Sequence, residues 1–228
     1  MRPPIIPAPR LARCSQALLI CLASAWLMGC QSTYYAAMER LGVPKRAILA
    51  DRVEEARDSQ QEAKEQFASA LDRFDAVLGL EGGALEDKYR ALAAEYEESA
   101  ERAEEVRERI GLVEDVAGAL FDEWRGELDE YESRELRARS KERLRETKRR
   151  YERLVQAMRK AEARMDPVLE TFQDQVLYLK HNLNARAVAS LAGELSAVEA
   201  DVAALVRAME ASIREADEFI AAMERQTG

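Results

Sequence analysis

Cysteine, glycine, proline and aromatic residues are all scarce in this sequence of 228 residues. The three cysteines lie within the first 30 residues, so the rest of the chain can form neither a disulfide-stapled domain nor a zinc–thiolate site. Ten glycines, six prolines and 6% aromatic residues are too few for the many turns of a β-sandwich, a β-barrel or a βαβ sheet. The composition therefore predicts an all-α protein.

A long hydrophobic run is missing as well. The apolar run 17–28 has 12 residues, whereas a membrane-spanning helix needs roughly 20. The residues before it include Arg2, Arg10 and Arg13 and no acidic residue. A positively charged segment followed by a short apolar run is typical of a signal peptide, which we place at residues 1–29.

Residues 27–30, with the sequence LMGC, resemble a bacterial lipobox. The resemblance implies diacylglyceryl transfer to the Cys30 sulfur, cleavage after Gly29 and further acylation, with 30–33 as a short tether. Several acyl chains give stable anchoring, and Gln31 in place of an inner-membrane retention Asp favours the outer membrane, facing the periplasm. We therefore expect a palmitate-bearing lipoprotein. An uncleaved anchor or an ordinary secretory signal is the alternative.

Apolar residues recur at alternating steps of four and three residues through most of the remaining chain. Such heptads are typical of coiled coils and long helix bundles. They predict helices over about 34–79, 84–130, 134–181 and 185–225 in one domain over 34–228. The matched lengths and short connections favour an elongated antiparallel four-helix bundle.

Glycine, serine and asparagine mark the ends of these helices. The expected breaks lie at 80–83, 131–133 and 180–184. Within the third helix, Pro167 follows Asp166 and precedes Glu170, which is the pattern of an N-cap, a first-turn proline and a capping acid. We expect a kink or a brief helix restart at this point.

Charge is distributed unevenly along the chain. Residues 84–132 carry 6 basic and 17 acidic side chains, whereas residues 133–164 carry 13 basic and 5 acidic ones. The basic segment is expected to pair with the acidic helix beside it, with anionic headgroups or lipopolysaccharide as the alternative partner. A periplasmic location and the net charge of −9 argue against nucleic acid.

The residues needed for chemistry are few. His181 is the only histidine, and the residue three positions before it is Tyr178, so the Glu-x-x-His pattern of di-iron bundles is missing. The sequence has no phosphate-binding Gly-rich loop with Lys-Ser/Thr. We therefore predict no catalytic residue, no metal site and no cofactor. His181 has either a helix-end role or, less in keeping with its position, a ligand or proton-switch role.

An up-down-up-down bundle places the turns at 80–83 and 180–184 at the same end. The four apolar residues 176–179 are more than one helix face can bury, which indicates either a protein-partner contact or tight helix-end packing. At the other end, Tyr34 and Tyr35 either lie at the membrane interface or begin the core of the first helix. The candidate partner-contact residues are Leu177, Tyr178, Lys180, His181, Asn182 and Asn184.

Three segments, 34–46, 51–57 and 174–185, resemble a family of proteobacterial lipoproteins classed as a domain of unknown function (domain of unknown function 2959). The resemblance covers roughly residues 34–225. It implies no activity, substrate or catalytic residue.

Together these features favour a non-enzymatic scaffold or adaptor, anchored by lipid in the cell envelope, with an envelope protein as partner. The alternative is a module that holds a lipid or other apolar ligand between its helices, in envelope transport or stress response. A large cavity would favour that alternative, whereas a solidly packed core would favour the scaffold. Self-association through exposed helix flanks is open as well.

Overall fold

The computed structural model describes residues 35, 38, 40–79, 85–182 and 184–225. These residues form helices and turns without any strand, which confirms the all-α prediction. Among the same residues, no helix combines the length and the apolar character that crossing a membrane requires. The chain divides into two compact units, Met1–Lys45 and Arg46–Gly228, and the second contains the bundle.

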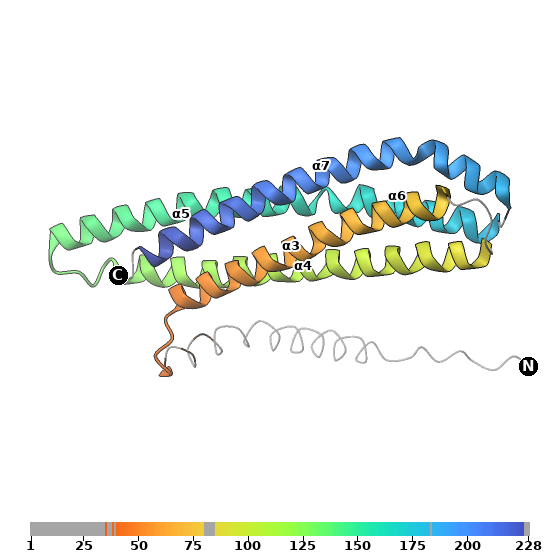
Figure 1. Ribbon diagram of the computed structural model, residues 1–228. Coiled ribbons are helices and arrows are strands. Elements are labelled where there is room, and N and C mark those ends of the chain that lie inside the picture. The colour runs from red at the N-terminus through yellow and green to blue at the C-terminus, as the bar shows by residue number, and fades with distance from the viewer. Residues whose placement is uncertain (1–34, 36–37, 39, 80–84, 183, 226–228) are drawn as a thin grey trace, which may run out of the picture. The chain divides into compact units, whose positions relative to one another are not determined.

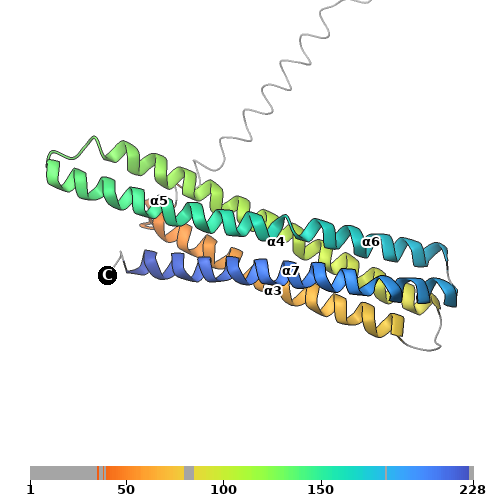
Figure 2. The same cartoon turned by 90° about the horizontal axis from the view of Figure 1, so that it is seen from above.

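The described helices form four long rods, one of which is interrupted. Neighbouring rods lie side by side along their length (Figures 1 and 2). Successive rods run in opposite directions, so the predicted up-down-up-down order is confirmed. The third rod consists of α5 and α6. The helices are α3 (Lys45–Gly79), α4 (Leu85–Glu127), α5 (Arg134–Glu162), α6 (Met165–His181) and α7 (Ala185–Glu224).

The first helix is shorter than the predicted 34–79. Leu41 and Gly42 form a turn, in which the N–H groups of Leu41 and Val43 both donate to the carbonyl of Met38 at 3.0 Å. Gly42 has a φ of 83°, a conformation that side-chain-bearing residues rarely adopt. Pro44 cannot donate an N–H and disfavours helix at the residue before it. The helix therefore begins after Pro44, at Lys45.

The third rod is interrupted at Ala163 and Arg164, close to the predicted restart. Helix α6 begins at Met165 with Arg164 as its N-cap, and no side chain caps it, so the predicted cap by Asp166 is wrong. Pro167 falls in the first turn, where a backbone N–H would have no intrahelical acceptor. The missing donor therefore does not disturb α6. Helix α4 also ends earlier than predicted, at Glu127, and continues as a turn in which the Glu130 N–H donates to the Glu127 carbonyl at 3.0 Å.

The heptad positions form the core, as the sequence pattern predicts. Phe67 and Phe74 of α3 stack on Phe172 of α6, with ring centroids 6.5 and 4.5 Å apart. Aromatic stacking adds to the free energy gained from burying these large side chains. The fully buried side chains from the other rods include Leu92, Ile110, Leu154, Met158, Leu205 and Met209.

Ion pairs connect the rods along their flanks. The predicted pairing of the basic segment with α4 occurs at Arg159, whose Nε–H donates to Glu114 at 3.1 Å. Arg137 at the start of α5 also pairs with Asp129 beyond the end of α4. Such exposed pairs each contribute a few tenths of a kcal/mol, about 0.2–1, so they set the choice of neighbour more than the stability.

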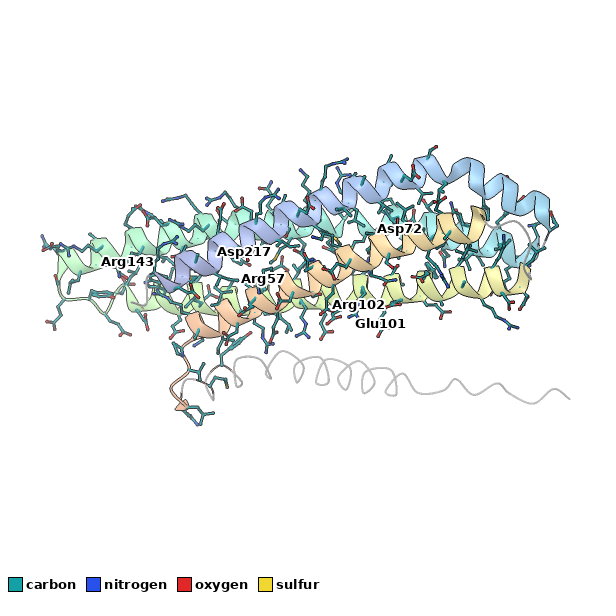
Figure 3. The ribbon with its side chains drawn as sticks, viewed as in Figure 1. Arg57, Asp72, Glu101, Arg102, Arg143 and Asp217 are labelled. Atoms are coloured by element: carbon teal, nitrogen blue, oxygen red, sulfur yellow. The ribbon has the colours of Figure 1, made fainter. Side chains whose placement is uncertain are left out.

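Helix α3 lies against both α4 and α7. Arg102 of α4 donates to Glu62 at 2.9 Å, and Arg57 donates to Asp217 of α7 at 3.2 Å; Figure 3 labels both arginines and Asp217. Among the other pairs of helices, α5 packs chiefly with α7 and α6 with α4. The interrupted rod therefore changes its main neighbour across the break.

Candidate partner-binding site at the α6–α7 end

Helix α6 divides the four apolar residues at its end between two faces. Val176 and Leu179 are buried, whereas Leu177 and Tyr178 are 44% and 42% exposed. An α-helix turns about 100° per residue, so consecutive side chains cannot all face one core. Two large apolar side chains therefore stand in solvent at this end of the bundle.

The end of α6 is closed by Asn182. Its side-chain amide donates to the carbonyl of Tyr178 at 3.0 Å, and its backbone N–H donates to the carbonyl of Leu179 at 3.2 Å. These bonds satisfy carbonyls that have no donor within the helix. The cap at this helix end is therefore Asn182, while Lys180, His181 and Asn184 are exposed.

A groove of about 390 Å³ lies between α6 and the described part of α7 that faces it. Gln175 and Leu191 are its buried walls, and Tyr178 is its exposed rim. Thr171, Asp174 and Ser190 complete it. Its volume falls within the range of about 300–1,000 Å³ that ligand-binding pockets occupy.

Gln175 is 3% exposed, and neither its side-chain nitrogen nor its oxygen has a hydrogen-bond partner among the described residues. Leaving a buried polar group unsatisfied costs about 1–3 kcal/mol. An amide offers both a donor and an acceptor, the two groups that a peptide backbone also presents. Both atoms are enclosed in the free bundle, so a polypeptide segment can pair with them only by displacing side chains of the groove as it binds. An apolar side chain of the segment would then lie against exposed Tyr178.

Sequence reasoning found Tyr178 but missed Gln175. The signal was a polar residue in the core stripe, one turn after Phe172 and one turn before Leu179. The other wall of the groove, Ser190 and Leu191, lies across a helix connection and becomes a neighbour only in the folded bundle.

The other residues predicted from the sequence lie partly outside the described residues. Cys30, Tyr34 and the turn at 80–83 lie outside the described residues, although the ends of α3 and α4 that flank this turn lie at the α6–α7 end (Figures 1 and 2). Tyr35 is 7% exposed, and its role at the membrane interface stays a prediction. In the part of the chain that the structure describes, no three His, Cys, Asp or Glu side chains are grouped to hold a metal ion.

The opposite end of the bundle is organised around Trp124. Its indole N–H donates to Ser140 Oγ at 2.8 Å, in a buried contact between α4 and α5. The guanidinium of Arg46, in the first turn of α3, lies 4.8 Å from the centre of the Trp124 ring. Burial, followed by the nearby charge of Arg143, lowers the pKa of Arg46. We call this region the α4–α5 end.

One turn further into the bundle, Phe121 packs edge-on against Tyr151, with ring centroids 5.3 Å apart. Burial, followed by the charge of Glu114, raises the pKa of Tyr151 to about 12. The neutral phenol is therefore the form that the fold favours.

This architecture defines a long antiparallel helical-bundle protein with grooves on its surface and buried heptad side chains in its core. Within that class, the chain belongs to the family described as Protein of unknown function (DUF2959), which matches residues 34–223. This match confirms the resemblance to a domain of unknown function. No curated protein and no solved structure matches the chain.

Proposed function

We propose that this protein is a non-enzymatic scaffold or adaptor of the cell envelope, anchored through a lipidated Cys30 to the outer membrane and facing the periplasm. Its α6–α7 end docks a segment of a partner protein. The unpartnered amide of buried Gln175, beside exposed Leu177 and Tyr178, is the observation that carries the proposal. The lipobox at 27–30 supports the anchor.

The partner is a polypeptide with an apolar side chain flanked by accessible backbone groups. The apolar side chain lies between Tyr178 and Leu191. Its binding displaces the side chains that enclose the Gln175 amide, and backbone N–H and C=O groups of the partner then pair with that amide. The stacked rings of Phe67, Phe74 and Phe172 occupy the space between the helices at this level, which supports a scaffold over a carrier of apolar ligands.

The test is photo-crosslinking in cells. A benzoylphenylalanine at position 177 is compared with one at position 136, because Leu136 is a similarly exposed leucine (52%) at the α4–α5 end. We expect an adduct of defined mass with an envelope protein at position 177 and not at 136. The same adduct disappears in the Gln175→Leu and Tyr178→Ala backgrounds, since each removes one part of the docking surface.

Circular dichroism of each variant verifies the fold. Adducts that are identical at 177 and 136, or unaffected by Gln175→Leu, contradict the partner site. The anchor is tested in the same cells by labelling with palmitate, which enters the wild-type protein and not the Cys30→Ser variant. Label in the serine variant contradicts the anchor.

A further inference from the structure

A second groove, of about 550 Å³, runs along the outside of the bundle between α5 and α7. Its floor consists of half-buried alanines from both helices, and its rim is mostly cationic. We call it the basic groove. The floor residues are Ala157, Ala204, Ala208 and Ala211.

The rim of the basic groove has an excess of positive charge. Arg153 lies 3.9 Å from Glu215, the one carboxylate of the groove. Lys160, Arg164 and Arg207 are exposed and have no carboxylate within ion-pair distance among the described residues. Complementary charge gives an interface its specificity and speeds association. The occupant is therefore acidic.

The floor indicates what shape the occupant has. The α5 side of the groove extends from Arg153 to Arg164, about 17 Å at the helical rise of 1.5 Å per residue. Alanines along that length leave room for the backbone of another helix to approach closely. A helix with small residues between its carboxylates fits both the floor and the rim.

The outer face of α4 has this composition. Glu108, Asp115 and Asp122 recur every seventh residue and are all exposed. Gly111 and Gly118 lie between them, and a Cβ added at either glycine would meet nothing within 4 Å, so this face is open. We call these five residues the acidic face. Asp122 also pairs with Arg125 of the same helix.

The two surfaces lie at the same height along the bundle. The Nε–H of Arg159, within the α5 stretch that lines the basic groove, donates to Glu114 at 3.1 Å. Glu114 is not part of the acidic face, but it is the residue before Asp115, which lies in the middle of that face on α4. Two bundles that stand side by side in the same direction therefore bring one acidic face beside one basic groove without an axial shift.

We propose that copies of this chain associate side by side, with the acidic face of α4 in one copy lying in the basic groove of the next. The two surfaces differ, so the contact is heterologous and produces rings or rows of bundles. The proposal does not rest on the partner at the α6–α7 end. Bundles that stand in the same direction are compatible with a shared membrane anchor.

Charge reversal on each side tests the contact with the purified full-length chain. Lys160→Glu with Arg207→Glu reverses the basic groove, and Glu108→Lys with Asp122→Lys reverses the acidic face. Each double variant alone is expected to associate about tenfold more weakly than wild type in sedimentation velocity, because like charges then meet. Mixing the two double variants restores association, since each reversed surface meets an opposite one.

Close approach is tested separately with Gly118→Leu, which fits the free bundle but separates the two helices. Gly193→Leu on α7 is the matched control, because a Cβ there also meets nothing within 4 Å and the position lies outside the groove. We expect about tenfold weaker association for Gly118→Leu and no change for Gly193→Leu.

Three results overturn the proposal: a wild-type chain that is monomeric at every concentration, double variants that associate like wild type, or a mixture that fails to reassociate. Binding of a monomeric wild type to vesicles of anionic lipid, lost in the groove variant, assigns the basic groove to a membrane surface instead. Circular dichroism verifies folding. If a charge variant does not fold, the Gly118→Leu and Gly193→Leu pair decides the question.

Discussion

The two ends of the bundle expose similar apolar side chains but differ in how their buried polar groups are hydrogen-bonded. Tyr131 and Leu136 are exposed at the α4–α5 end, and Leu177 and Tyr178 at the α6–α7 end. Exposed apolar area alone therefore does not distinguish the ends.

The largest buried polar side chain differs between the two ends, although Thr147 Oγ1, between Ser140 and Tyr151, also lacks a partner among the described residues. At the α4–α5 end the Trp124 N–H is donated to Ser140, and the Trp124 ring is covered by Arg46. At the α6–α7 end both polar atoms of Gln175 lack a partner among the described residues. A satisfied buried group stabilises the fold, whereas an unsatisfied one keeps its hydrogen-bonding capacity for a partner. This contrast supports the proposal that the α6–α7 end docks a partner, while the contacts of Trp124 hold the α4–α5 end together.

The largest expected effect on stability is at the α4–α5 end. Trp124→Ala removes a large side chain that is 8% exposed, together with the bond to Ser140 and the cation–π contact with Arg46. We expect the free energy of unfolding to fall by about 3–5 kcal/mol. Urea denaturation followed by circular dichroism measures it.

Tyr131→Ala is the control, because this aromatic side chain at the same end is exposed. Its effect is expected to stay within about 0.5 kcal/mol. Equal losses for the two variants would show that the packing of Trp124 does not hold this end together.

A smaller effect of opposite sign is expected at the α6–α7 end. Gln175→Leu replaces an unsatisfied amide with an apolar group of similar size, so the free energy of unfolding rises by about 1–3 kcal/mol. Denaturant midpoints of the wild type and the variant measure the gain.

Gln60→Leu sharpens the comparison. Gln60 is fully buried in α3 and is also unpartnered, but it does not line the α6–α7 groove. The Gln60→Leu variant should be stabilised by a similar amount and keep the adduct at position 177. The Gln175→Leu variant should be stabilised and lose the adduct. A destabilised Gln175→Leu variant would assign Gln175 a structural role.

The smallest expected effect on stability near neutral pH concerns Tyr151, which lies beside the α4–α5 end. Its pKa is raised from 10 to about 12, first by burial and then by Glu114. The folded state binds the phenol proton more tightly, so stability is unaffected below pH 10 and falls as pH rises from 10 towards 12. Tyr151→Phe should flatten this part of the stability profile. Thermal unfolding between pH 9 and 12 measures the stability of the wild type and of the variant. If stability falls equally steeply with pH in both proteins, the raised pKa of Tyr151 is refuted.

The fold was largely predictable because it depends on a local periodicity. The steps of four and three that include Met158, Ala161, Met165 and Val168 continue across the break between α5 and α6, so one apolar stripe identifies the whole rod. The helix cap at the break was not predictable in this way. Asp166 has the right side chain for a cap, but the first turn begins at Met165 because the preceding helix continues to Glu162.

The candidate sites depended on neighbours that the periodicity does not specify. Leu177 and Tyr178 could be found within one segment, since four consecutive apolar residues cannot share a face. Gln175 could be recognised as part of a groove only from the structure, in which Gln175 and Leu191 line the same groove. The basic groove likewise combines Lys160 with Arg207 from a different helix.

The position of α7 in the chain has a consequence for biosynthesis. One wall of the α6–α7 groove comes from α6, and the other from Ser190 and Leu191 of α7. Helix α7 is synthesised after α3, α4, α5 and α6, so the groove forms only when this helix has docked. A partner that binds there discriminates against nascent or truncated chains. Recognition is thereby coupled to completion of the fold.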